Sequence, residues 1–549
     1  MLADSSDQRG PVGDHPEPVA VPDRDERIAV MPRTSRRAAL LAAGAATMGT
    51  IGIAAARNEW DLHWSVPEAG ALGGRVPTSL DILDPDPVLH LVRRATFGQT
   101  PELLDEVGKR GVTQWLDDQL HPDRIDDPVH ALIGRLYPLL AASAAQLRGA
   151  IPADDPLLAV QQLIEATMIR QIWSSRQLSE VMVDFWSNHF NVTTALALTR
   201  TTKPVEDRTV IRRHALGRFE DLLLADAKSP AMLVHLGNYV SRGDEPNENY
   251  GRELLELHTV GTGAGYTEDD VRNSAYVLTG WGVDDKEEFR FLPAEHYIGP
   301  VQILGWSARN GDPDEGVAVG EDYLRYLARH EHTARHLSYK LAVRFVSDDP
   351  PESLVTRLAD SYLSGGTAIV PWLHTLFSST EFAESVGRKV RRPLEDLVAA
   401  VRALGIRPPS GPDTAGVWEL VVLSKALGQS PLGAAEPTGY ADVAADWLST
   451  SGALGRWNIH RHVIDQGVTG LQGPGLDDLL SGRAPQDMGA FVDRLTTRVT
   501  GQVVRHDHRA ALLAFLGVSE SGAYDDRILS RSLRGVVALI LDSPYHLLR

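Results

Sequence analysis

The chain has 549 residues, with 54 Lys or Arg, 73 Asp or Glu and a formal net charge of -19. This acidic balance argues against nucleic acid as a partner, because a nucleic-acid-binding protein needs a basic face. The absence of cysteine excludes disulfides, thiolate metal sites, iron–sulfur clusters and a cysteine nucleophile. The hydrophobic fraction of 43% is high enough for a folded core.

The first 56 residues have the pattern of an export signal. Residues 1–35 are polar and Pro-rich, and Arg36-Arg37 then precede a stretch of small, mildly apolar residues. Paired arginines before such a stretch are typical of a twin-arginine signal, and Ala54–Ala56 provides a cleavage site of small residues. We therefore expect a secreted or cell-envelope protein. Two alternatives stay open, namely translation from Met31 and retention of residues 38–56 as a membrane anchor.

Residues 57–86 are predicted to form a linker, and residues 87–549 a single large helical domain. Apolar residues recur there at helical spacing, and no stretch is long and apolar enough to span a membrane. We therefore predict an all-α fold, without stable membrane insertion once the signal is removed. Helices are expected at residues 101–120, 157–192, 320–345, 351–363, 368–383, 388–405, 415–427, 486–503 and 525–541.

Patterns typical of strands are scarce. Residues 289–291 alternate in hydropathy, and residues 301–304 follow them after a turn that contains Pro and Gly. We predict that these two segments pair as one small β-hairpin on a helical protein. Just before them, Thr267 and Asp270 predict a helix that begins with a capping box, and Gly280 predicts its end.

Residues 247–258 carry an unusual density of charge for a predicted helix. At 100° per residue, Glu253 and Glu256 lie on one side, and His258 lies on the other with two leucines. One interpretation is an ion-paired outer face with His258 buried. The other is a buried helix whose two carboxylates meet polar groups of other helices. Two carboxylates three residues apart suit a divalent metal ion or an acid–base pair.

A second polar cluster favours the buried site. His189 closes an apolar stripe at helical spacing, and Asp184 and Asn188 stand beside it. A buried polar cluster is satisfied by a network or by a bound ion, so the alternative is a structural network that fixes helix packing. We predict that Glu253 or Glu256 approaches His189. The candidate cofactor is a divalent metal ion with His189, Glu253 and Glu256 as ligands. The candidate catalytic residues are His189, Glu253, Glu256 and His258, and the candidate cofactor-binding residues are Arg93, Arg94, Asn188 and Asn249.

Common catalytic motifs are absent from the sequence: it contains no G-x-S-x-G, no P-loop and no H-E-x-x-H. His332 and His336 are four residues apart and could share a metal ion, but a solvated face is favoured on an Arg-rich helix. The glycines at 261, 263 and 265 follow a predicted helix rather than a strand. They therefore predict a helix end and not a dinucleotide site.

A series of short motifs runs in order along residues 87–548. They are His90–Gly98, Trp115-Leu116, Phe185–Phe190, Pro246–Tyr250, Arg252–Thr259, Thr279–Trp281, Lys340-Leu341 with Arg344-Phe345, Lys389 with Arg392–Glu395, and Ser543–Tyr545. In number and order they resemble the domain-of-unknown-function 1800 family of exported bacterial proteins. The resemblance implies a mostly helical fold, export and no established activity. The family's genes often lie beside those of a second exported family, domain of unknown function 1501, so a protein of that family is the expected partner.

The chain departs from this family's pattern at two places. The usual His-Asp-x-Gly-x-Lys-Thr stretch is His296–Gln302 here, without its acid and its base. An Asp that usually follows the Met-Leu-x-x-Leu segment is Gly237. If those Asp residues are metal ligands in the family, the site is weakened in this chain, which counts against a metal ion.

Three classes of function are compatible with these observations. The first is a metal-dependent or acid–base hydrolase that acts on an envelope or extracellular polymer, with Glu253 and Glu256 as ligands or as base and acid. The second is a non-catalytic envelope scaffold or accessory protein for an exported partner. A third, less favoured, is a carbohydrate-binding surface that uses Trp281 and Trp306, because scattered tryptophans more often belong to a core. The sequence leaves open whether the protein is an enzyme.

We predict that replacing both Arg36 and Arg37 with Lys blocks export, because the twin-arginine route requires the arginine pair. The fraction of protein outside the cytoplasmic membrane measures this, and normal secretion of the variant would refute the route. Cleavage is expected after the Ala54–Ala56 run. N-terminal sequencing of the secreted protein would contradict that prediction if the protein began before Arg36.

Overall fold

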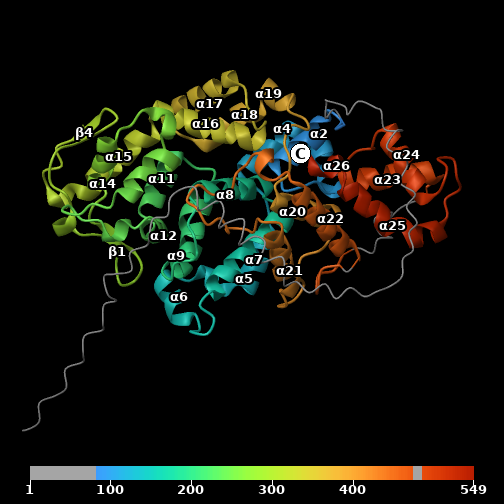
Figure 1. Ribbon diagram of the computed structural model, residues 1–549, viewed down its shortest axis with the longest axis horizontal. Helices are drawn as coiled ribbons and strands as arrows, with labels where there is room; N and C mark the ends of the chain where they lie inside the picture. Colours follow the sequence, from blue (N-terminus) through green and yellow to red (C-terminus); the bar gives the residue numbers. More distant parts are fainter. Residues whose placement is uncertain (1–81, 466, 474–484) are drawn as a thin grey trace, which may run out of the picture. The chain divides into compact units, whose positions relative to one another are not determined.

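The computed structural model describes residues 82–465, 467–473 and 485–549 (Figure 1). The predicted signal, residues 1–56, and most of the predicted linker lie outside these described residues. All of the described residues belong to one compact unit, Pro77–Arg549. They are mainly helical with two small antiparallel sheets, which confirms the predicted all-α fold with a small β element. Within the described chain, no helix is both long and apolar enough to cross a membrane.

Proline at the first helical position and a capping side chain before it begin several helices. Asp86, for example, accepts hydrogen bonds from the backbone N–H groups of Val88 at 2.7 Å and Leu89 at 3.1 Å. The α-helices of the first half are α2 (Pro87–Ala95), α3 (Pro101–Arg110), α4 (Val112–Leu120), α5 (Pro128–Leu136), α6 (Ala144–Ala150), α7 (Leu158–Trp173), α8 (Gln177–His189), α9 (Thr199–Glu206), α10 (Arg212–His214), α11 (Phe219–Ala227), α12 (Pro230–His235), α13 (Glu248–Glu253) and α14 (Glu268–Val277).

Helices also dominate the second half of the described chain. They are α15 (Gly316–Ala328), α16 (Glu331–Phe345), α17 (Glu352–Ser364), α18 (Ile369–Phe377), α19 (Thr380–Ala383), α20 (Pro393–Ala403), α21 (Ala415–Ala426), α22 (Thr450–Asp465), α23 (Met488–Thr500), α24 (His506–Leu516), α25 (Asp526–Leu541) and α26 (Pro544–Leu547). The predicted helices at 101–120 and 320–345 are each two helices, because Gly111 and residues 329–330 break them. The predicted capping box at Thr267 and Asp270 is confirmed.

Short turns complete the chain between these helices. Two are π-helical, η3 (Asp207–Ile211) and η5 (Leu254–His258). The others are 3-10 turns, namely η1 (Pro122–Arg124), η2 (Pro138–Ala141), η4 (Asn238–Val240), η6 (Thr262–Ala264), η7 (Pro293–Glu295), η8 (Pro313–Glu315) and η9 (Ala444–Asp446).

Of the four strands in the described residues, two were predicted in the right segments, but with the wrong pairing. β2 (Phe289–Phe291) pairs with β1 (Trp281–Val283), and β3 (Val301–Ile303) pairs with β4 (Trp306–Ala308). Two hairpins therefore replace the single predicted one. The reason is local: Leu304 and Gly305 both have positive φ and turn the chain back at once, so β3 pairs with the next segment.

A network of buried charges joins elements that are distant in the sequence. The carboxylate of Glu395 on α20 is paired with Arg344 of α16, with Arg392 at 3.2 Å and with Arg549 at 2.8 Å. Arg392 also pairs with Asp184 of α8 at 2.5 Å. Burial alone would raise the pKa of Glu395, but the arginines hold it well below its usual value. One carboxylate thus ties α8, α16, α20 and the last residue together.

We expect Glu395→Gln to destabilise the fold by about 3–5 kcal/mol, because it leaves three buried guanidinium groups without their shared anion. Urea-induced unfolding followed by circular dichroism measures this. Glu352→Gln is the matched control. Glu352 lies at the start of α17 and pairs with Arg335 of α16 on the surface, so this substitution should have no measurable effect on stability. Equal urea midpoints for the two variants would contradict the prediction.

Candidate functional site

His189 and His258 come together in the interior, as the predicted site requires. His189 ends α8, His258 ends η5, and their ring centres are 6.0 Å apart. Lys340 Nζ lies 2.8 Å from Nδ1 of His189, and Nε2 of His189 lies 3.2 Å from the carbonyl oxygen of His258. Burial and then the charge of Lys340 lower the pKa of both imidazoles, that of His258 to about 3. Neutral His189 therefore accepts from Lys340 at Nδ1 and donates from Nε2.

Glu253 and Glu256 do not join this pair, so that part of the prediction is wrong. Both side chains are half-buried. Glu256 accepts a hydrogen bond from the Tyr266 hydroxyl at 3.3 Å, and within the described chain Glu253 has no hydrogen-bond partner. The predicted metal ligands are therefore not brought together. The physical reason is that the leucine side of this segment, which carries His258, faces the core.

The two arginines predicted to bind a cofactor hold backbone carbonyl groups instead. Arg93 donates to the carbonyl oxygens of Thr500 at 2.7 Å and Tyr545 at 3.2 Å. Arg94 donates to those of Phe345, Val346 and Ser385 at 3.1, 3.1 and 2.5 Å. Both arginines are buried. A guanidinium group that satisfies the last carbonyls of helices acts as a cap from a distant segment, so this prediction is corrected to a structural role.

The two candidate asparagines also bind backbone. Asn188 donates to the carbonyl oxygen of Tyr440 at 2.8 Å and accepts from its N–H at 2.6 Å, which fixes the loop at residues 429–446. Asn249 donates to the carbonyl oxygen of Leu236 at 3.0 Å. Neither side-chain amide is directed at a cofactor, since each is engaged by a backbone segment.

Three other expectations change as well. His336 lies against η5 with a buried Nε2 atom, so the solvated face predicted for His332 and His336 is wrong for His336. Trp281 is fully buried, and Trp306 is buried and donates to Asp322 at 2.9 Å. Neither tryptophan is available for the carbohydrate-binding surface considered from the sequence.

A cluster of buried carboxyl groups lies on α9 and α11, where the sequence analysis placed no site. Lys203 Nζ is 2.7 Å from an oxygen of Glu206, and both side chains are almost wholly buried. Both oxygens of Asp226 are buried without a hydrogen-bond partner among the described residues. Burial raises the pKa of Glu206 against the opposing charge of Lys203, and burial followed by the nearby Glu206 raises that of Asp226 well above its usual value.

Glu206 and Glu287 both line a pocket of about 220 Å³, together with Lys228 and Ser229. Glu287 is only 5% exposed. One of its oxygens lies 3.2 Å from the guanidinium group of Arg148, and the other accepts a hydrogen bond from the Thr201 hydroxyl at 2.5 Å. Two acidic residues in different surroundings therefore line the pocket. The carboxyl oxygens of Glu206 are buried beside Lys203, and the carboxylate of Glu287 lies beside Arg148 and accepts a hydrogen bond from Thr201.

The backbone is unusual at Glu287 and directly after Glu206. Glu287 has a φ of +62°, in the left-handed region that side chains other than glycine rarely adopt. Glu206 directly precedes the π-helical turn η3, and His258 ends the other π-helical turn, η5. Such turns are rare and occur often at functional sites. Pro204 inside α9 is the one sequence signal of this irregular helix, since burial of Glu206 cannot be inferred from local spacing.

A separate group of potential metal ligands is buried between α20, α22 and α26. Ligand atoms of Asp396, His460 and His546 lie within 4.8 Å of one another, the only such group of three in the part of the chain that the structure describes. Burial would lower the pKa of His460, but Asp396 at 3.0 Å and Asp542 at 2.8 Å raise it to about 9. Arg456 lies 3.5 Å from Asp396. Because two cationic side chains already neutralise Asp396, the group is a salt-bridge network.

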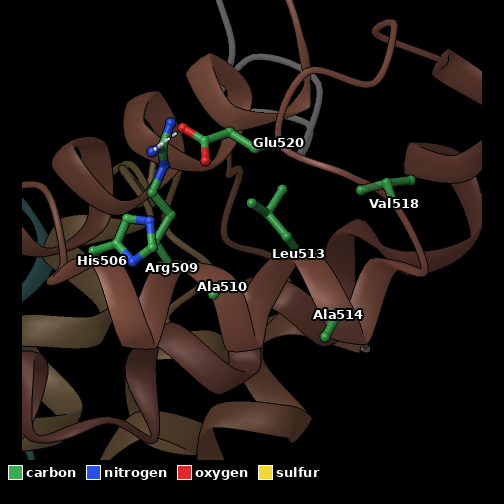
Figure 2. Close-up of a pocket in the computed structure, with 7 residues that line it drawn as sticks. All are labelled: His506, Arg509, Ala510, Leu513, Ala514, Val518 and Glu520. Atoms are coloured by element: carbon green, nitrogen blue, oxygen red, sulfur yellow. Dashed lines mark hydrogen bonds and ion pairs between the residues drawn. The ribbon is translucent and has the colours of Figure 1, made fainter.

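Figure 2 shows a pocket of about 240 Å³ beside α24, where Arg509 points toward Glu520. The guanidinium group pairs with Glu520 at 2.6 Å and with Asp493 at 2.7 Å. Apart from a histidine, Arg509 is the one side chain lining this pocket that could supply positive charge for a ligand. Two carboxylates already neutralise it. The carboxyl pocket beside Glu206 remains the better candidate.

A family model described as "Protein of unknown function (DUF1800)" matches residues 90–548. The chain belongs to this family. No curated protein and no solved structure matches the chain. The DUF1800 description names no activity, so the chemistry of the site has to carry any functional proposal.

The two departures from the DUF1800 pattern lie in ordered, well-packed positions. Gly237 has a φ of +74°, and a side chain there would meet the amide of Asn247 at 2.7 Å. Tyr297 stacks on Tyr276 with ring centroids 3.9 Å apart, and its N–H donates to the Thr279 hydroxyl at 2.8 Å. Neither position supplies a carboxylate in this chain, so neither can ligate a metal ion through an acidic side chain.

The wild type is expected to lose stability as pH rises, and we expect Asp226→Asn to lose less. The folded protein binds the Asp226 proton more tightly than the unfolded chain does, because burial raises the pKa. Stability from this proton is complete below the unfolded pKa of about 3.9 and falls by at most about 1.4 kcal/mol per pH unit above it. Asparagine cannot ionise and so loses this dependence.

Melting temperatures between pH 5 and pH 9 measure this effect. The slope should decrease rather than vanish, since His460 also loses its stabilising proton as pH rises toward about 9. Asp105→Asn is the control, because Asp105 pairs with Lys109 on the surface of α3. The same slope in wild type and Asp226→Asn would contradict the prediction.

Proposed function

We propose that the protein is an exported acid–base hydrolase that acts on an envelope or extracellular polymer, with Glu206 and Glu287 as its catalytic carboxyl groups. One observation carries the proposal: two acidic residues, Glu206 and Glu287, line a single pocket in contrasting surroundings. Pairs of carboxyl groups whose environments differ in this way divide the roles of acid and base in hydrolases.

Glu206 is the proposed general acid. Burial raises its pKa, which favours a proton on the group that must protonate a leaving oxygen. Lys203 at 2.7 Å holds the carboxyl group, and the nearby charge of Asp207 adds to the effect of burial in raising its pKa. Lys203 is therefore a positioning residue, because the pocket is lined by Glu206 and not by Lys203.

Glu287 is the proposed base or nucleophile. Arg148 and Thr201 both act as donors to its oxygens, which is the surrounding that a carboxylate requires. Its left-handed backbone holds the side chain in the pocket at a conformational cost of about 1–3 kcal/mol, a cost typical of residues fixed for function. A pocket of about 220 Å³ has room for one small unit. This size favours attack at the end of a polymer over attack within it.

A second candidate function is an accessory protein for an exported partner of the family domain of unknown function 1501. Exposed apolar side chains on α21 and α22 favour it, since exposed patches of this kind mark interaction surfaces. The two helices are joined by the ion pair of Glu419 and His462 at 2.7 Å. The exposed residues on these helices are Trp418, Val422, Leu454 and Trp457, and exposed Leu448 lies just before α22.

We expect the wild-type protein to release soluble products from a panel of envelope polysaccharides and peptidoglycan, and Glu206→Gln and Glu287→Gln each to lower the rate by about 100-fold or more. Glu352→Gln, on the exposed face of α17, should retain wild-type activity. Circular dichroism verifies folding of each variant. Wild-type activity in either pocket variant would refute the assigned residues. Absence of release by the wild type would favour the accessory function.

A further inference from the structure

A second cavity, of about 480 Å³, lies between α5, α7, α8 and the segment that runs from α9 to α10. It is more than twice as large as the pocket beside Glu206 and shares no lining residue with it. Pro204 and Asp207 line the larger cavity, while Val205 and Glu206 line the smaller one. The same irregular helix therefore separates two distinct sites.

Most of the arginines around this cavity already have partners. Arg176 donates to the carbonyl oxygen of Ile125 at 2.9 and 3.1 Å, and Arg208 donates to that of Ala142 at 3.0 Å. Arg212 pairs with Glu180 at 2.9 Å and with Asp207 at 2.8 Å. These groups build the walls and keep the local charge balanced.

Arg170 of α7 differs from its neighbours. It lines the cavity and makes no hydrogen bond or ion pair within the described residues, and its Nη1 atom is buried. Burial, and then the charge of Arg212, lower its pKa to about 10, so it keeps its positive charge at neutral pH. The nearby carboxylates Glu180 and Asp207 are held by Arg212, and Asp127 accepts hydrogen bonds from Ser174 and Ser175. A buried guanidinium group that no anion contacts directly is unfavourable, and an oxyanion in the cavity would supply that contact.

The cavity also offers an unused acceptor. One oxygen of Asp207 binds Arg212, and the other is buried without a hydrogen-bond partner among the residues that the structure describes. A carboxylate oxygen can only accept, so its natural ligand is a hydroxyl group. Ile133 and Leu163 add apolar wall between these polar groups. A volume of about 480 Å³ lies within the range of about 300–1,000 Å³ typical of small-molecule sites.

We propose that this cavity binds an acidic sugar unit, with its carboxylate or phosphate on Arg170 and a hydroxyl group on Asp207. A bare anion would satisfy only Arg170, and a neutral sugar would satisfy only Asp207. The inference concerns binding alone and does not depend on the reaction proposed at Glu206 and Glu287.

Isothermal titration calorimetry of the full chain tests it with four probes: glucuronate, glucose 6-phosphate, glucose and inorganic phosphate. We expect at least one of the two acidic sugars to bind about tenfold or more tightly than both glucose and inorganic phosphate, since a charge-assisted pair and a hydroxyl contact act together. The preferred acidic sugar distinguishes a carboxylate from a phosphate source. Failure of both acidic sugars to bind, or binding of glucose with equal affinity, would overturn the proposal.

Arg170→Gln should weaken binding of the preferred acidic sugar by about tenfold or more. Arg357→Gln is the matched control, because Arg357 of α17 pairs with Glu381 of α19 and does not line the cavity. Equal affinities for the two variants would overturn the assignment of Arg170. Because Arg170→Gln could fail to fold, a second measurement uses the wild type. The acidic sugar should protect Arg170 from phenylglyoxal, as quantified by peptide mass spectrometry, and unchanged labelling would refute the site.

Discussion

Three arginines converge on the carboxylate of Glu395, and the rest of the architecture depends on how they are paired. Two of the elements that this carboxylate connects, α8 and α16, also carry His189 and Lys340. The charges are buried, so each partner is needed to offset the desolvation of the others. The geometry of the interior histidines is therefore set by an ion network that contains none of them.

Buried charge is arranged differently in the two halves of the interior. Three arginines pair with the carboxylate of Glu395 and keep it ionised. Around Glu206 and Asp226 a single lysine faces two carboxyl groups, so burial raises the pKa of both. The first arrangement favours the ionised form of its carboxylate, and the second favours the protonated form of its carboxyl groups. This contrast is why the carboxyl pocket, rather than the larger ion network, is the place to look for chemistry.

The sequence was sufficient where the determining interactions are local. Helical periodicity, the capping box at Thr267 and the approach of His189 to the His258 segment follow from spacing and burial of apolar faces. It was insufficient where a distant segment decides the role of a residue. From the sequence, Arg93 and Arg94 resemble a ligand-binding pair. In the structure, they donate hydrogen bonds to carbonyl groups at the ends of distant helices. Burial of Glu206 likewise depends on helices that no local pattern identifies.

The π-helical turn at Asp207–Ile211 fixes the angular relation between two cavities. A π-turn accommodates one residue more than an α-turn, so it acts as a one-residue insertion within a continuous helix. The wider turn takes up this extra residue locally, so the helix before it and the helix after it keep their directions. Glu206 lines one cavity and Asp207, the next residue, lines the other. The number of residues in this turn, as well as the identity of its side chains, is therefore a constraint on the sequence.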